Sequence, residues 1–276
     1  NVVYLNFEFL LKFLPLFLIV KIVDFYLCIM KYINYLLSSI WRLWFFTVFL
    51  FTFFSFLPLL FIFTGLYKKE ETVCYIARYW SKIILFTSFI YPKIEWEEKI
   101  NLNQPYIICA NHASSLDIPF ILSIINLPIQ FIGKVELSKI PLFGYFFKHN
   151  SVIVNRKNKK DGYNAFLNAN KKLQKNISIC IFPEGGIPPK NIFLKNFKNG
   201  AFKLASENNI KIIPITMPDN KLMFPQTYYD GYPGRARIKV HKHIDPTRIK
   251  KNTPDNMKEL VYNIIFDQLK KYESNK

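Results

Sequence analysis

An apolar run without a single charged residue extends from Leu43 to Tyr67, and it constrains the fold more than any other feature of the sequence. An α-helix needs about 20 such residues to cross a bilayer, and this run is longer. Residues 1–37 are almost as apolar, but charged residues interrupt them about once per two helical turns. This spacing favours an interfacial or re-entrant helix over a second clean span. We expect residues 1–98 to form a helical membrane-binding region. The alternative is a signal peptide, but no small-residue cleavage site follows and the hydrophobic region is far too long for one.

The chain is strongly basic, with 37 Lys and Arg residues against 19 Asp and Glu residues and a net charge of +18. All but six of the basic residues are lysines, and the sequence shows no recognisable nucleic-acid-binding module with interleaved arginines and aromatic residues. A basic surface beside a hydrophobic anchor instead favours anionic lipid headgroups, or an acidic substrate or carrier, as partners. Nucleic acid is therefore not an expected partner.

The four cysteines indicate neither a disulfide framework nor a metal site, because they form no CxxC pair and no ligand spacing. Cys109 and Cys180 each lie inside an apolar segment, where a thiol is usually a core side chain. No other histidine stands at a ligand spacing from His112, so a metallohydrolase is the weakest alternative. We expect no bound metal, and a reducing, cytoplasmic-facing compartment for the rest of the chain.

Residues 99–276 alternate short apolar segments with segments of helical periodicity. Strands that are apolar on both faces and alternate with helices are typical of a mostly parallel sheet covered on both sides, so we expect an α/β domain of this kind. Its strands are expected at 105–110, 129–133, 151–154, 177–182 and 210–216, with an edge strand at 235–244. Its helices are expected at 117–125, 161–175, 200–208 and 254–272, and an amphipathic helix that ends near Tyr91 should connect it to the N-terminal region.

Three polar clusters follow predicted strands of this sheet, where ligands bind in open α/β folds. The first is NHASSLD, in which His112 and Asp117 are five residues apart. Residues i and i+4 align on a helix, so this pair requires His112 in the loop and Asp117 in the first helical turns, with Ser114 or Ser115 as the cap. The carboxylate would then fix the imidazole tautomer and leave the second ring nitrogen as a base. Alone, the short motif fits equally well a helix cap with an incidental histidine.

The second and third clusters supply cations and a rigid acidic turn. Lys134 and Arg156 end two segments that return to the same edge of the sheet, and they are candidates for an anion clamp. In FPEGG, Glu184 precedes Gly185 and Gly186 directly after a buried strand, which predicts a tight turn whose carboxylate and backbone N–H groups face a pocket. We expect these five residues to bind substrate. Taken alone, Lys134 fits an ordinary surface lysine, and FPEGG fits an ordinary turn.

In this order and spacing, the three clusters resemble the sequence blocks of the glycerolipid acyltransferase family, above all its 1-acylglycerol-3-phosphate acyltransferases. NHASSLD, with its HxxxxD pattern, is similar to the first block, and GKVELSKIPLFG through VNR is similar to the second. FPEGG is similar to the third block and IIPIT to the last. The resemblance covers about residues 100–220. It implies the glycerolipid acyltransferase fold, with His112 as general base and Asp117 as its orienting partner.

One departure from the family pattern bears on the substrate. The family usually reads EGT followed by Arg or Ser, whereas this chain has Gly186 and Ile187. If the arginine of the family helps to hold a substrate phosphate, that role falls here on Arg156, Lys134 or Lys190. The exact acceptor is therefore open.

The resemblance implies a reaction and its partners. An acyl chain would pass from an acyl thioester, acyl-CoA or acyl carrier protein, to lysophosphatidic acid, making phosphatidic acid for phospholipid biosynthesis. No cofactor is expected, because the thioester is already activated, and backbone N–H groups near Gly185 and Gly186 would stabilise the oxyanion. The alternatives are another acceptor, such as glycerol-3-phosphate or a different lysolipid, and a non-enzymatic membrane lipid-binding protein. The expected location is a membrane, namely a bacterial inner membrane, with the active site on its cytoplasmic face.

Overall fold

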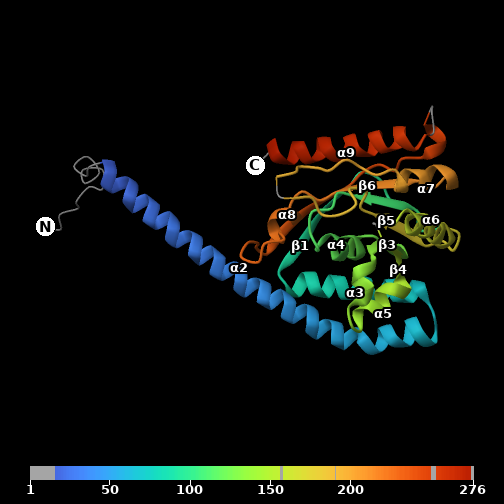
Figure 1. Cartoon of the computed structure of the whole chain (residues 1–276), viewed down its shortest axis with the longest axis horizontal. Coiled ribbons are helices and arrows are strands. Elements are labelled where there is room, and N and C mark those ends of the chain that lie inside the picture. Colours follow the sequence, from blue (N-terminus) through green and yellow to red (C-terminus); the bar gives the residue numbers. More distant parts are fainter. Residues whose placement is uncertain (1–15, 156–157, 190, 250–252, 275–276) are drawn as a thin grey trace.

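A seven-stranded sheet in the order β1-β7-β6-β2-β5-β3-β4 forms the centre of the protein in the computed structural model, which describes residues 16–155, 158–189, 191–249 and 253–274. Neighbouring strands run parallel throughout, except β6 and β7. Helices cover both faces of the sheet, and one long helix projects far beyond it (Figure 1). The mostly parallel α/β architecture expected from the sequence is confirmed.

The strands are β1 (Ile90–Trp96), β2 (Ile107–Ala110), β3 (Ile129–Lys134), β4 (Ser151–Val154), β5 (Ser178–Ile181), β6 (Ile212–Thr216) and β7 (Gly234–Val240). The helices are α2 (Leu16–Phe61), α3 (Glu70–Thr87), α4 (Asp117–Ile124), α5 (Phe143–Asn150), α6 (Lys159–Leu173), α7 (Gly200–Asn208), α8 (Asn220–Met223) and α9 (Pro254–Ser274). Short helical turns are η1 (Ile62–Leu66), η2 (Val135–Lys139) and η3 (Pro246–Arg248). The expected apolar strands and the expected helices are all present, with bounds shifted by at most a few residues.

The sheet separates two cores. Alternate residues of β2 point to opposite faces, so Ile108 packs with α3 and α4 whereas Ile107 packs with α6, α7 and α9. Every residue of β2, β5 and β6 is buried. This double burial explains why these strands are continuous apolar runs in the sequence. Cys109 and Cys180 are fully buried in these cores, as expected.

Two expectations about the strands were wrong. Residues 90–96 were assigned to the N-terminal region, but they form β1, which pairs along its length with β7 at the edge of the sheet. An edge strand tolerates Pro92 and outward polar residues, which hide the strand pattern. The segment expected as an edge strand is instead the interior strand β7, in which Arg237 pairs with Asp219 and Lys239 pairs with Glu95.

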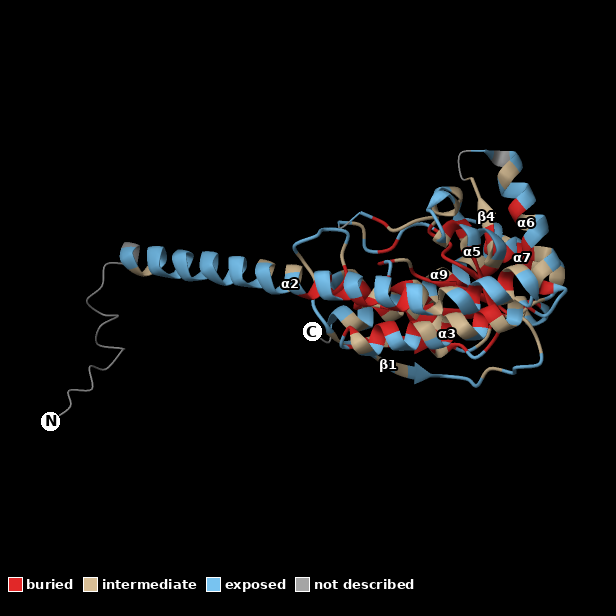
Figure 2. Ribbon diagram, turned by 90° about the horizontal axis from the view of Figure 1, so that it is seen from below, coloured by how far each residue is buried: buried red, intermediate tan, exposed pale blue. Residues whose placement is uncertain are grey.

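Residues 16–61, which are the described part of the first hydrophobic segment and most of the second, form one continuous helix, α2, rather than an interfacial helix followed by a separate span. At about 1.5 Å per residue its 46 residues extend for about 69 Å. The part before Trp41 is mostly exposed and leads away from the domain (Figure 2). The part that holds the uncharged run packs one side against the domain through Trp41, Phe45 and Phe53. Among the described residues, Leu18–Leu66 is the one helical segment long and apolar enough to cross a membrane.

Candidate active site

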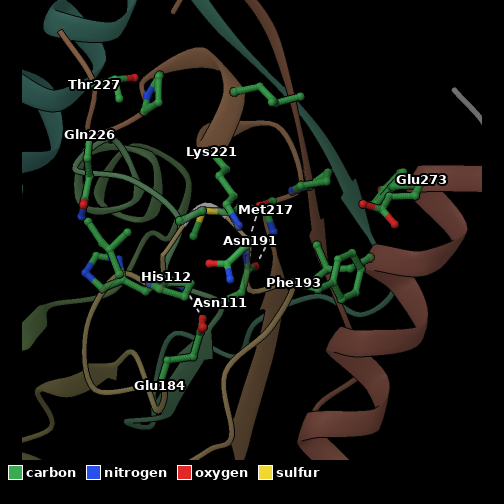
Figure 3. Close-up of a pocket in the computed structure, with 18 residues that line it drawn as sticks. Asn111, His112, Glu184, Asn191, Phe193, Met217, Lys221, Gln226, Thr227 and Glu273 are labelled. Carbon is green, nitrogen blue, oxygen red and sulfur yellow. Dashed lines mark hydrogen bonds between the residues drawn. The ribbon is translucent and has the colours of Figure 1, made fainter. Parts of the chain in front are cut away.

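The loops that leave the carboxyl ends of three adjacent central strands meet at one cavity. They follow β2, β5 and β6, and the cavity between them and α9 has a volume of 480 Å³ (Figure 3). The sequence analysis placed polar clusters after β2 and β5, and both reach the cavity. The contribution of the loop after β6 was missed. The cluster after β3 does not line the cavity with any described residue.

His112 and Asp117 form the pair that their spacing predicts. His112 lies in the loop after β2, and Asp117 is the first residue of α4 and is completely buried. Asp117 Oδ2 lies 2.8 Å from His112 Nδ1, and Oδ1 accepts a hydrogen bond of 2.7 Å from Asn220 Nδ2. A carboxylate can only accept here, so Nδ1 carries the proton. The other ring nitrogen, Nε2, has no hydrogen-bond partner among the described residues and keeps its lone pair.

Ser114 of the motif bonds the backbone at the start of α4. Its Oγ accepts a hydrogen bond from the N–H of Leu116 at 3.2 Å and donates one to the carbonyl oxygen of Phe224 at 2.7 Å. The backbone N–H groups of Ala113 and Ser114 donate to Asp117 Oδ2 at 2.7 and 2.9 Å. The aspartate therefore shapes the loop that carries His112 as well as orienting its ring, because one carboxylate oxygen accepts all three of these hydrogen bonds.

Two residues of the loop after β5 fix the position of His112. The imidazole stacks on the ring of Phe182, with centroids 4.1 Å apart and planes at 12°. The backbone N–H of His112 donates to Glu184 Oε1 at 2.6 Å. The side chain of His112 remains 15% exposed, and it lies on the wall of the cavity. Phe182 was not singled out from the sequence, where it is one of 28 phenylalanines.

Glu184 is buried, and both of its carboxylate oxygens accept backbone hydrogen bonds. Besides the bond from His112, Oε2 accepts from the N–H of Lys195 at 3.0 Å. Burial raises the pKa of the Glu184 carboxyl, and these two N–H donors oppose the shift. Glu184 therefore ties the loop after β5 to the loop after β2, and its expected contact with substrate stays a prediction.

The tight turn expected at the two glycines is present. Gly185 has φ of +77° and Gly186 has φ of +151°, which side chains other than hydrogen rarely allow. A Cβ atom on Gly185 would lie 2.8 Å from Cε of Lys198. The N–H of Gly185 donates to the carbonyl oxygen of Phe182 at 3.0 Å. It is therefore not a free donor for an oxyanion, which corrects the role expected for it.

Of the expected anion-clamp cations, only Lys134 lies among the described residues. Lys134 is exposed at the end of β3 and does not line the cavity, while Arg156 and Lys190 lie outside the described residues. A different cation, Lys221 of α8, does line it. Burial lowers the pKa of Lys221, and the carboxylates of Glu184 and Glu273 oppose this shift. Sequence reasoning missed Lys221 because nothing in its neighbourhood distinguishes it from the other lysines.

Asn111 is a second functional residue that sequence reasoning passed over. Its side chain donates to the carbonyl oxygen of Met217 at 2.9 Å and accepts from the N–H of Met217 at 2.8 Å. This two-way contact locks the end of β2 to the end of β6, next to His112. The position of Asn111 directly before His112 in NHASSLD was the available signal.

The site offers no activated thiol and no metal ligands in the part of the chain that the structure describes. Burial raises the pKa of both Cys109 and Cys180, which keeps these thiols protonated. The described residues contain no group of three or more His, Cys, Asp or Glu side chains placed to hold a metal ion. The arrangement instead suits general-base chemistry at His112 Nε2 on a substrate that brings its own activated group.

Comparison with known proteins relates this site to one family. The model of the family described as Acyltransferase matches residues 92–218, a range that includes all the site residues expected from the sequence. The 1-acyl-sn-glycerol-3-phosphate acyltransferase LPAT1, chloroplastic, of Arabidopsis thaliana is 30% identical over 176 residues, which are 62% of this chain and 48% of that protein. The 1-acyl-sn-glycerol-3-phosphate acyltransferase of Helicobacter pylori is 30% identical over 141 residues, which are 51% of this chain and 60% of that protein. The chain spans about half the length of several curated relatives that it matches.

A solved structure shares the fold. The crystal structure of the 1-acyl-sn-glycerophosphate (LPA) acyltransferase PlsC from Thermotoga maritima superimposes with a TM-score of 0.70. The alignment covers 88% of this chain and 98% of that chain, at 23% sequence identity. At this identity the likeness concerns the arrangement of helices and strands, and it includes much of the N-terminal region as well as the sheet.

Proposed function

We propose that this chain is an acyltransferase that transfers an acyl chain from an acyl thioester to the free hydroxyl of 1-acyl-sn-glycerol-3-phosphate, making phosphatidic acid. The observation that carries this proposal is the His112–Asp117 pair, held at 2.8 Å on the wall of the cavity with Nε2 unpartnered among the described residues. Several relatives are named 1-acyl-sn-glycerol-3-phosphate acyltransferases, which supports this choice of acceptor.

The mechanism follows from this geometry. His112 Nε2 accepts the proton of the acceptor hydroxyl while that oxygen attacks the thioester carbonyl carbon. The tetrahedral intermediate then collapses, the carbon–sulfur bond breaks, and the imidazolium returns the proton to the leaving thiolate. Asp117 holds Nδ1–H throughout and stabilises the imidazolium by its negative charge. A correctly placed base of this kind contributes about 10²- to 10⁴-fold to the rate.

The surroundings of the site suit a lipid substrate. Apolar side chains line much of the cavity, including Ile187, Phe193 and Leu222. The loop after α8 contacts α2, because Arg42 donates to the carbonyl oxygens of Asp230 and Pro225. Pro225 also lines the cavity. The long apolar helix would thus hold the cavity at a membrane surface, and we place this surface on the cytoplasmic face of the membrane.

A panel of acceptors and donors tests the proposed function. Purified protein in detergent is incubated with acyl-CoA or acyl-loaded acyl carrier protein, and with 1-acylglycerol-3-phosphate, glycerol-3-phosphate or lysophosphatidylcholine. Radiolabelled phosphatidic acid should form fastest from 1-acylglycerol-3-phosphate. Faster acylation of another acceptor would reassign the substrate. This outcome is tested because Gly186 and Ile187 stand where the family usually has Thr and then Arg or Ser. Binding of lysolipid without any acyl product would favour the non-enzymatic lipid-binding alternative.

A further inference from the structure

We propose that Lys221 binds the phosphate group of a substrate in the cavity, an inference that rests on the proposed function and adds a residue outside the three sequence clusters. Lys221 is the one lysine or arginine among the described residues that line the cavity. Its side chain reaches from α8 into the space between His112 and Phe193 (Figure 3).

Backbone carbonyl groups hold the ammonium group in place. Nζ of Lys221 donates to the carbonyl oxygen of Ile192 at 2.7 Å, and the carbonyl oxygen of Pro189 lies 3.5 Å away. These contacts orient the cation without neutralising its charge. Lys221 forms no salt bridge with a carboxylate of the described residues, so its charge is still available to a ligand.

The nearest carboxylates, those of Glu184 and Glu273, do not form an ion pair with Lys221. Glu184 faces the same cavity, but both of its oxygens accept backbone N–H groups. Glu273 stands on α9 on the far side of the cavity (Figure 3). A partly buried cation that lacks a paired anion is costly to desolvate, and an anion that enters the cavity recovers this cost. The site therefore favours an anionic group beside Lys221.

Phosphate is the anion that the proposed reaction brings to this cavity. The acceptor carries a phosphate monoester, and both candidate donors carry a phosphate on their pantetheine arm. Ile187 lines the same cavity with an apolar side chain, and Lys134 lies away from it. Among the described residues, a charge-assisted hydrogen bond from a lysine or arginine to phosphate inside the cavity can therefore come only from Lys221.

Steady-state kinetics of four proteins test this assignment: wild type, Lys221→Met, Lys221→Arg and the control Lys203→Met. Lys203 is an exposed lysine of α7 that pairs with Glu207 and does not line the cavity. The acceptors are 1-acylglycerol-3-phosphate and the neutral monoacylglycerol with the same acyl chain. The donors are acyl-CoA and an acyl-pantetheine without phosphate. Thermal unfolding of each variant checks that it is folded.

We expect Lys221→Met to raise one KM by about 10- to 100-fold, the loss expected for a hydrogen bond to a charged group. A rise for 1-acylglycerol-3-phosphate with no change for monoacylglycerol assigns Lys221 to the acceptor phosphate. A rise for acyl-CoA with no change for acyl-pantetheine assigns it to the donor phosphate. Lys221→Arg should retain most of the affinity. Kinetics equal to those of Lys203→Met, or an equal loss with the neutral substrates, would overturn the proposal.

A binding measurement separates this proposal from the proposed function. If the wild type forms no phosphatidic acid, the proposed function fails, but phosphate binding can still be measured. Titration of glycerol-3-phosphate by calorimetry should give an affinity for the wild type that Lys221→Met weakens and Lys203→Met leaves unchanged. Equal affinities for the three proteins would contradict a phosphate site at Lys221 regardless of activity.

Discussion

Replacing Glu184 by glutamine tests whether this carboxylate positions His112 or contacts the substrate. The two oxygens of Glu184 accept the N–H groups of His112 and Lys195 at 2.6 and 3.0 Å. Glutamine keeps one acceptor and turns an NH₂ group toward the other N–H, so one bond becomes a contact between two donors. Leaving a buried N–H without its acceptor costs about 1–3 kcal/mol, and relief from burying a carboxylate offsets part of this cost.

The catalytic effect follows from the shift of the loop. When His112 loses its backbone acceptor, the imidazole is no longer held in place, and a displacement of about 1 Å can cost about 100-fold in rate. We expect Glu184→Gln to lower kcat by about 10- to 100-fold while the KM for 1-acylglycerol-3-phosphate changes little. Glu207→Gln, on the exposed face of α7, is the matched control.

We obtain kcat and KM from initial rates of phosphatidic acid formation over a range of acceptor concentrations. Urea unfolding of the same proteins gives the change in the free energy of unfolding. A normal kcat with a KM raised tenfold or more would refute the positioning argument and would instead support the substrate contact expected from the sequence.

Three further predictions concern the same framework. Asp117→Asn should lower kcat by about 10³-fold or more, because the amide keeps the shape but not the charge that stabilises the imidazolium, and a loss below tenfold in the same assay would contradict this role. Gly185→Ala should reduce the free energy of urea unfolding by about 1–2 kcal/mol because Gly185 has a positive φ. The control Gly162→Ala in α6, where a Cβ meets no atom within 4 Å, should be neutral or stabilising. Equal effects of the two substitutions would be inconsistent with the strained turn. Burial lowers the pKa of His241 to about 4, so His241 contributes stability that is present above its unfolded pKa of about 6.5 and is lost as pH falls through 4. His241→Gln should remove up to about 3 kcal/mol of the pH dependence of the free energy of unfolding in this range. Parallel plots of this free energy against pH for the wild type and the variant would exclude the contribution.

The sequence predicts those parts of the fold whose residue pattern is compatible with only one local structure. The strands β2, β5 and β6 are buried on both faces, so every position is apolar and the pattern admits few other interpretations. The offset between His112 and Asp117 was informative for the same reason, because only a loop residue and a first-turn residue can meet at that spacing.

Other features of the fold and the site could not be predicted, because their residues fit two environments equally well or depend on contacts between distant parts of the chain. An apolar helix face packs equally well against lipid or protein, so the run in α2 did not reveal that one side lies on the domain. Strand β1 carries Pro92 and outward polar residues, which also fit a loop. The contacts of Glu184 with His112 and of Asn220 with Asp117 join residues 72 and 103 positions apart, and no local pattern encodes such pairs.

The cations that bind substrate could not be identified from the sequence alone. Lys134 and Arg156 remain predicted substrate contacts, whereas the structure brings Lys221 to the cavity instead of Lys134. A lysine in a chain of this composition carries little information by itself. Its significance comes from the cavity that surrounds it, which only the folded chain defines.

The central claim is that His112 is the general base, and replacing it is the most direct test. Phosphatidic acid formation from 1-acylglycerol-3-phosphate and acyl-CoA is measured for purified wild type, His112→Ala and the control His149→Ala, which changes an exposed histidine of α5. We predict that His112→Ala lowers kcat by about 10²- to 10⁴-fold with unchanged unfolding temperature, and that His149→Ala keeps wild-type activity. Turnover by folded His112→Ala within a few fold of the wild-type rate would contradict the account.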